Sequence, residues 1–363
     1  MIELILHIGM GKTGTTSIQY ALGSNHGCLS RQRTQYLGLW FDLIDPRFSG
    51  DMGHEAFGAL SEAEMRRAAG IFVKRLERLR AESGITRFII SNEAIYGLTE
   101  ENCTRLADHF APFIATLRKH LKVRIIVYVR DPYDWLPSAY TQWGIHHKIM
   151  RGPVRPYGEL ARALVGTYAG LLRWKHHHPD LLEVRRFDKS IDVVDDFCST
   201  VGIELENAQD RVLERSSVPE SVFRFVFNSG FEEEAVPERF DIAMGGLSLS
   251  NAPTLHEVIC DGFCYRETAD ILEDNRQMFS SIRDSIGIDF LSGPLNAELP
   301  KEGPVRERLV EQLVYVVAAQ SDRIASLEAA VEKLKGRRGR RVRRLLGRIG
   351  ASFPDMMRTK TVR

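Results

Sequence analysis

Short runs of apolar, β-branched residues alternate along roughly the first 190 residues with segments that have helical spacing. This alternation is typical of a parallel sheet whose faces are covered by helices. Residues 35–60 and 211–300 have no regular period, so we expect loops and small helices there. The predicted strands are residues 2–8, 87–91, 123–129 and 182–187, and the predicted helices are residues 15–22, 62–83, 157–176 and a segment that begins near residue 191.

From residue 309 onward the apolar positions follow a spacing of three and four residues, which predicts another helix. Its seam covers about three heptads, with polar Gln320 at one core position. We expect this helix either to form a dimer contact through residues 309–334 or to pack on its own domain. The predicted organisation is an α/β domain over residues 1–300, a helix or short coiled coil over 305–335, and a basic, flexible tail over 336–363.

The charge distribution separates the tail from the rest of the chain. The 363 residues carry 49 Lys and Arg against 48 Asp and Glu, and 44% of them are hydrophobic, as in ordinary globular proteins. This near-neutral balance argues against a nucleic-acid-binding protein. Residues 333–348, however, contain nine basic residues and no acidic one, and leaving them out gives 40 basic against 48 acidic residues, a net charge of −8.

The sequence predicts a cytoplasmic location. No apolar run reaches the roughly 18 residues that a membrane-spanning helix needs, and the first residues show neither a basic leader nor a cleavage site. The five cysteines are scattered and odd in number, which is typical of reduced thiols. The arginine-rich run, from Arg337 to Arg348, has interleaved apolar residues, so we expect it to form a peripheral contact with the inner face of the membrane, to hold an acidic partner, or to remain a solvated tail.

The clearest chemical signal follows the first predicted strand, where residues 7–17 read H-I-G-M-G-K-T-G-T-T-S. Glycines allow a tight turn, after which consecutive backbone N–H groups face one concavity at the positive end of a helix. Lys12 adds a positive charge, so the segment predicts a phosphate-binding loop. A Walker A loop needs a glycine six residues before the lysine, and that position is Leu6. The plain alternative is a strand–turn–helix connection with hydroxyl caps.

A second candidate phosphate site follows the most strand-like segment of the chain. Arg130 comes at the carboxyl end of that strand, where ligands of open α/β sheets bind, and its guanidinium can hold a phosphate with two hydrogen bonds. Pro132 suits the first turn of a helix, on which Ser138 lies farther along. The alternative is a surface arginine that pairs with Asp131 or Asp134. Two phosphate sites at two strand ends fit a nucleotide phosphorylated at its 5′ and 3′ positions.

Together these two elements resemble the sulfotransferases that use 3′-phosphoadenylyl sulfate (PAPS). The 3′-phosphate element of this family is a strand ending in R-[DN]-P, with a serine eight residues after the arginine, and Arg130 and Ser138 occupy these places. The resemblance covers about residues 1–200, and residues 142–153 look like bacterial carbohydrate-type members. The family's 5′-phosphosulfate pattern K-[ST]-G-[ST]-[ST] is matched by Lys12, Thr13, Gly14, Thr15 and Thr16.

The resemblance implies a P-loop-like parallel sheet, PAPS as co-substrate without a metal, and transfer to a hydroxyl or amine of an acceptor such as a carbohydrate or glycan. It also implies a general base, a histidine or a glutamate in this family. Glu93 comes directly after a predicted strand, on the same edge as Lys12 and Arg130, and is the expected base. His54, in a glycine-flanked segment, is the rival. Lys12 would also be catalytic by stabilising the departing bisphosphate.

Two other functions are compatible with the sequence. A P-loop nucleotide kinase or NTPase would need a carboxylate that holds magnesium at a strand end, and Asp188 is the nearest candidate. A non-catalytic scaffold would act through the C-terminal helix and the basic tail.

The aromatic and basic stretch over residues 142–148 would either contact an acceptor sugar or belong to the core.

Overall fold

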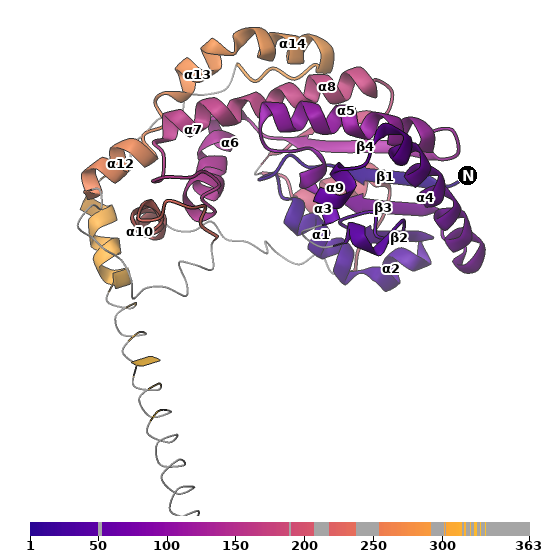
Figure 1. Ribbon diagram of the computed structural model, residues 1–363, viewed down its shortest axis with the longest axis horizontal. Helices are drawn as coiled ribbons and strands as arrows, with labels where there is room; N and C mark the ends of the chain where they lie inside the picture. Colours follow the sequence, from indigo (N-terminus) through magenta and orange to yellow (C-terminus); the bar gives the residue numbers. More distant parts are fainter. Residues whose placement is uncertain are drawn as a thin grey trace, which may run out of the picture. The chain divides into compact units, whose positions relative to one another are not determined.

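The computed structural model describes residues 1–49, 53–188, 190–206, 218–236, 254–291, 301 and 303–313, and then the single residues 316, 320, 323, 324, 327 and 331 (Figure 1). Contacts within the chain divide it into one unit over Met1–Glu302 and a second over Gly303–Arg363. The predicted basic tail, with its arginine-rich run, lies outside the described residues. No helix in the described ranges is long and apolar enough to cross a membrane.

Five parallel strands form one sheet in the order β2-β3-β1-β4-β5. The central strands are apolar along nearly their whole length and fully buried, as parallel strands are when helices cover both faces of a sheet. The predicted α/β class with a helix-flanked parallel sheet is therefore confirmed. The strands are β1 (Glu3–His7), β2 (Thr34–Gly38), β3 (Arg87–Ser91), β4 (Lys122–Val129) and β5 (Leu182–Arg186).

The connections between strands place helices on both faces of the sheet. The connection from β1 to β2 passes β3 in one direction, whereas the following connections run in the opposite direction. Because such crossovers are right-handed, the helices after β1 lie on one face and those that precede β3, β4 and β5 lie on the other. The first group is α1 (Thr15–Ser24) and α2 (His26–Arg31), and the second includes α4 (Glu62–Ser83), α5 (Glu100–Leu117) and α8 (Ala169–His177).

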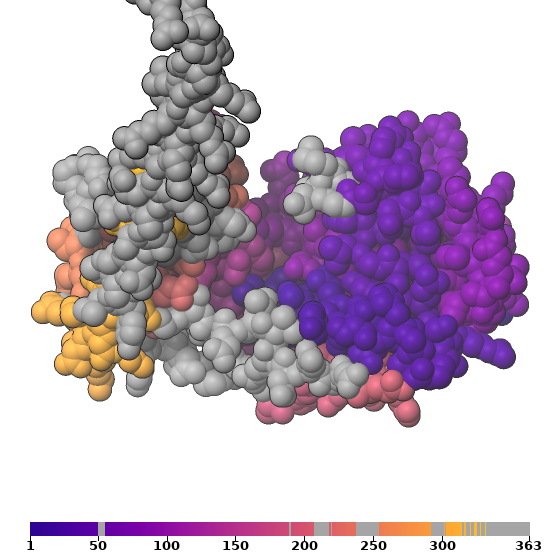
Figure 2. Space-filling model, turned by 90° about the horizontal axis from the view of Figure 1, so that it is seen from below, coloured from indigo at the N-terminus to yellow at the C-terminus, as the bar shows by residue number. Residues whose placement is uncertain are grey.

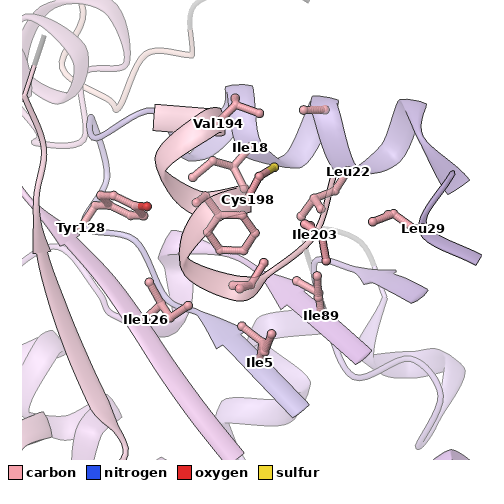
Figure 3. Close-up of a cluster of buried hydrophobic side chains, with 13 residues drawn as sticks. Ile5, Ile18, Leu22, Leu29, Ile89, Ile126, Tyr128, Val194, Cys198 and Ile203 are labelled. Atoms are coloured by element: carbon pink, nitrogen blue, oxygen red, sulfur yellow. The ribbon is translucent and has the colours of Figure 1, made fainter. Parts of the chain in front are cut away.

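The core on the first face joins α1 to α9 (Val193–Val201) and to three strands (Figure 3). Residues Ile18 and Leu22 lie one turn apart on α1, and they face the same strands as Val194 and Cys198 of α9. Burial of each such large apolar side chain contributes about 1.5–3 kcal/mol. This packing fixes the start of α1 against the sheet, directly after the predicted phosphate loop.

The opposite face is built on aromatic rings and on a long helix. The rings of Phe41 and Phe57 stack with their centroids 4.8 Å apart, and other phenylalanines of α4 and α5 surround them. The helix α4 begins with a capping box between Ser61 and Glu64 and ends at Gly84, which has a φ of 74°. These two signals account for the agreement between α4 and the predicted helix over residues 62–83.

The remaining elements follow β4 in the chain and pack on one another and on α8. In the space-filling view, the N-terminal residues in indigo and purple form one continuous surface (Figure 2). Helix α10 packs on η3, and α14 packs on α8. These elements are α6 (Pro132–Ala139), η3 (Tyr140–His146), α7 (Tyr157–Leu164), η4 (Val165–Tyr168), α10 (Val218–Ser229), α12 (Leu255–Phe263), α13 (Thr268–Asp274) and α14 (Arg276–Ile286).

The four predicted strands and the predicted helices at residues 15–22, 62–83 and near 191 are confirmed. The interpretation of residues 35–60 as loops and small helices missed β2, an edge strand of five residues with mixed polarity. The predicted helix over 157–176 is interrupted by the tighter turn η4. Small helices are present within 211–300 as expected, in its described parts.

Candidate functional site

The carboxyl edge of the sheet has a topological switch point at β1. This strand leads into a helix on one face of the sheet, whereas its neighbours β3 and β4 lead into helices on the other face, so the loops after them separate and leave room for a ligand. The segment after β1 is the predicted phosphate loop, and the segment after β3 begins with Glu93 in η2 (Glu93–Ile95). Two of the predicted site elements are therefore neighbours.

The backbone of the loop from Gly9 to Gly14 has a left-handed conformation at three of its residues. The φ angles are 79° at Gly9, 66° at Lys12 and 84° at Gly14. A left-handed conformation costs a residue other than glycine about 1–2 kcal/mol, so Lys12 is held there by its surroundings. Such alternation of backbone conformation turns successive N–H groups toward one side, which is the geometry of an anion-binding nest.

Neighbouring side chains crowd the glycines of this loop. A Cβ atom on Gly9 would lie 2.5 Å from Cβ of Glu93, and one on Gly11 would lie 2.8 Å from the ring of Trp143. A Cβ atom on Gly14 would lie 2.6 Å from Val193. Each glycine is therefore required by a close approach.

The hydroxyl groups of the loop have different surroundings. The hydroxyl of Thr13 donates to the carbonyl of Met10 at 2.5 Å, so this buried side chain holds the loop together. The side chain of Thr15 is 3% exposed, and its Oγ1 is buried without a hydrogen-bond partner. An orphaned buried hydroxyl at the first residue of α1 is a polar group that a bound anion would satisfy. Thr16 is exposed.

Lys12 is held by a segment that lies 130 residues farther along the chain. Its ammonium donates to Oε1 of Gln142 at 3.1 Å. Gln142 belongs to η3, a wide helical turn in which the N–H of His147 donates to the carbonyl of Gln142, five residues earlier. The indole of Trp135 in α6 donates to the carbonyl of Gly11 at 2.8 Å. Sequence reasoning considered residues 142–148 as an acceptor contact and missed their contact with the loop.

Glu93 lies beside the loop and is oriented by Gln19 of α1. The Gln19 amide donates to Oε2 of Glu93 at 3.3 Å and to the carbonyl of Ser91 at 2.9 Å. The Ser91 carbonyl belongs to β3, so it fixes the position of the Gln19 amide, and that amide in turn holds the Glu93 carboxylate. Burial and the nearby Glu93 carboxylate raise the pKa of Tyr36 to about 12, so this phenol stays protonated. Sequence reasoning did not single out Gln19.

Arg130 leaves the carboxyl end of β4 into a nearly enclosed position. Its side chain is 11% exposed and lies 3.6 Å from the carboxylate of Asp134. The guanidinium carbon lies 5.6 Å from the ring centre of Phe187, and the hydroxyl of Tyr168 donates to the Arg130 carbonyl at 2.5 Å. The ion pair with Asp134 is present, but the arginine is not the surface residue of the alternative interpretation. Phe187 also lies within 3.5 Å of a Cβ atom built on Gly14, so it lies between the two sites.

Asp131 and Ser138 complete this second element. Asp131 caps α6 by accepting from the N–H of Tyr133 at 3.0 Å, and it pairs with Arg186 at 3.3 Å. Burial, as the largest effect, raises the pKa of Asp131. Ser138 is half-buried near the end of α6. Asp131 therefore bonds to Tyr133 and Arg186 while it also lies within electrostatic range of Arg130, and Asp134 forms the ion pair with the guanidinium.

The structure describes the side chain of only one of the two histidines in the predicted site segments. His54 lies in α3 (Gly53–Gly58), but its side chain falls outside the described residues. His7 is fully buried, its Nδ1 lies 2.8 Å from the hydroxyl of Ser91, and burial lowers its pKa to about 3. His7 is therefore a neutral core residue.

Among the described residues, no three His, Cys, Asp or Glu side chains come together as a metal site. Asp188, the candidate magnesium ligand, accepts a hydrogen bond from the N–H of Ser190 at 2.8 Å. In comparisons with known proteins, no family model matches the chain and no curated protein matches it.

Proposed function

We propose that the chain is a sulfotransferase that moves the sulfuryl group of PAPS to a hydroxyl or amine of a carbohydrate acceptor. The observation that carries the proposal is the pair of anion-suited elements at neighbouring strand ends, the nest after β1 and the enclosed Arg130 after β4. A nucleotide with phosphate groups at both its 5′ and 3′ positions would engage both elements, whereas a nucleoside triphosphate would need only the nest.

The residues of the loop fit the 5′ end of such a nucleotide. Lys12 and the backbone N–H groups would face its phosphosulfate, and the orphaned hydroxyl of Thr15 would gain a partner there. Thr13 is already bonded to Met10, so its contribution would be to hold the loop's shape rather than to contact the ligand. Gly14 and Thr16 would provide N–H groups at the start of α1.

The 3′-phosphate would be held by Arg130 and Ser138. Arg130 is the buried cation at the end of β4, and a guanidinium in such an enclosed position binds a phosphate more strongly than one in water. Asp134 pairs with Arg130 at 3.6 Å and is itself 46% exposed, so a phosphate can take over the guanidinium while Asp134 turns to solvent.

In the proposed reaction the S–O bond between the sulfuryl group and the bisphosphate breaks as a bond to the acceptor oxygen or nitrogen forms. The bisphosphate leaves with the electron pair, and Lys12 and the loop N–H groups stabilise its negative charge. Glu93 takes the acceptor proton, and the Gln19 amide holds the carboxylate in place for this step. The half-buried ring of Trp143, against Gly11, would form an apolar wall for a sugar.

Isothermal titration with adenosine 3′,5′-bisphosphate tests the nucleotide assignment directly. We expect binding in the presence of a chelator, and we expect Arg130→Ala to weaken it. Arg118→Ala is the matched control, because Arg118 pairs with Asp180 at 3.1 Å just before β4, at the opposite edge of the sheet. Magnesium-dependent binding of ATP without binding of the bisphosphate would establish a P-loop nucleotide kinase or NTPase instead.

A further inference from the structure

The C-terminal unit presents a row of exposed apolar side chains. Val310, Leu313, Ile324, Leu327 and Val331 are between 37% and 58% exposed, and each of these residues is helical. Seven other large apolar residues in the described part of the chain are exposed to this degree, but they are scattered over residues 1–236, whereas these five fall between residues 310 and 331. Exposed apolar side chains at this spacing mark a surface that pairs with another molecule.

The residue types along this stripe follow the rule for parallel two-stranded coiled coils. When Val310 is placed at position a of a heptad, the a positions are all β-branched and the d positions are leucine except for one glutamine. β-branched residues at a with leucine at d favour two parallel helices. The a positions are Val310, Val317, Ile324 and Val331, and the d positions are Leu313, Gln320, Leu327 and Leu334.

Two further features agree with pairing between identical chains. A single polar residue at a core position fixes the register, because Gln320 can bond only to Gln320 of the partner subunit when the helices are parallel and aligned. Arg323 falls at position g and Glu328 at the following position e, so Arg323 faces Glu328 of the partner subunit across the seam. These positions have opposite charges, which selects the parallel arrangement.

We propose that residues 310–334 pair with the same segment of a second copy of this chain as a parallel, two-stranded coiled coil. The inference rests on the C-terminal unit alone and does not depend on the proposed sulfotransferase activity. A parallel arrangement would also bring the two arginine-rich runs to the same end of the dimer, because each run begins directly after the seam.

Sedimentation equilibrium of the full chain tests the dimer. We expect a species of twice the 41.2 kDa chain mass at micromolar concentration. Ile324→Asp places a charge in the seam and should raise the dissociation constant by about 100-fold or more. Ala325→Asp is the matched control, since it adds the same charge at the neighbouring outer position and should leave the dimer intact. A monomer at all concentrations, a trimer or tetramer, or a dimer insensitive to Ile324→Asp would overturn the proposal.

Disulfide trapping tests the direction of the helices. Leu313→Cys and Leu327→Cys lie at d positions toward the two ends of the seam, and each should form a disulfide with its own copy in a parallel, aligned dimer. The wild-type chain, with its five free cysteines, gives the background. An antiparallel pair would trap neither variant efficiently, and that result would overturn the parallel assignment. Gln320→Leu should tighten the dimer by about tenfold or more, because it removes the one polar core position.

Discussion

The loop after β1 and the arginine turn after β4 end neighbouring strands, yet they are held in different ways. The loop takes its shape from its own backbone, with positive φ angles at three residues, and it is held in place by Trp135 and Gln142 from a distant part of the chain. The side chain of Arg130 is held by Asp134, four residues farther along, and by Phe187. The comparison teaches that glycines can encode the shape of a loop locally while its contacts depend on the strand order, whereas the ion pair of the arginine is itself local.

The largest effect is expected for a substitution of Glu93, which lies against Gly9 of the loop. Glu93→Gln should lower turnover by about 10²–10⁴-fold, because the amide cannot take the acceptor proton, while bisphosphate affinity changes by no more than about twofold. The measurement is PAPS turnover beside a bisphosphate titration. Glu3→Gln is the control, since Glu3 pairs with Arg87 and Lys122 at the other end of β1. Unaltered turnover in Glu93→Gln would move the base to His54.

The second largest effect is expected for Gly9→Ala, which tests whether the loop needs a glycine at this position. Gly9→Ala should lower the free energy of unfolding by about 2–5 kcal/mol, because a left-handed backbone and a clash with Glu93 act together. Gly23→Ala, in the last turn of α1 with open space around it, should raise stability by up to about 1 kcal/mol. Denaturant unfolding measures both. Equal stability of wild type and Gly9→Ala would contradict the close approach described above.

On the arginine side, Arg130→Ala should weaken bisphosphate binding by about 2–3 kcal/mol, the scale of a lost charge-assisted hydrogen bond. Titration calorimetry measures the change. Arg130→Lys should recover only part of the affinity, since an ammonium cannot form the paired hydrogen bonds of a guanidinium. An Arg130→Ala variant that binds as tightly as wild type would remove Arg130 from the site.

Gln19→Met tests the positioning of Glu93 and should lower turnover by about tenfold, since it removes one hydrogen bond from a charged acceptor. Bisphosphate affinity should remain unchanged. Gln32→Met is the control. The Gln32 amide also bonds to backbone, since it donates to the carbonyl of Glu204 and accepts from the N–H of Glu204, but Gln32 precedes β2 and so lies at the amino edge of the sheet. Equal turnover in the Gln19 and Gln32 variants would show that Gln19 does not position the carboxylate.

The smallest effect is expected at Phe187. Phe187→Leu removes the ring beside the guanidinium of Arg130 and should weaken bisphosphate binding by about 0.5–1 kcal/mol, the value of a partly exposed cation–π contact. The same substitution at Phe231, which packs on Phe227 at a distance of 5.0 Å, should leave binding unchanged. A loss in the Phe187 variant as large as that in Arg130→Ala would show that the ring contacts the nucleotide itself.

Local signals explain how much of the structure could be predicted from the sequence. The capping box at Ser61 and the left-handed Gly84 give the ends of α4, and the apolar run after residue 86 gives β3. The loop glycines and Arg130 could be found because their residue types follow predicted strands. β2 could not be predicted, since an edge strand of five residues with mixed polarity has no distinctive period.

The contacts that complete the site required the structure. Gln142 reaches Lys12 across 130 residues, and the wide turn that presents it follows Pro137, which interrupts the regular hydrogen bonding of α6. Phe187 reaches Arg130 only because β5 lies next to β4. Such pairings depend on strand order, and no local pattern in the sequence specifies that order.

Transfer of radiolabelled sulfur from PAPS is the most direct test of the proposed activity. The purified chain is incubated with labelled PAPS and a panel of p-nitrophenyl glycosides in the presence of a chelator, and both labelled glycoside and adenosine 3′,5′-bisphosphate are quantified. The account predicts equal amounts of the two products with wild type and their loss in Lys12→Ala. Absence of transfer and of bisphosphate release, together with no binding of the bisphosphate, would contradict it.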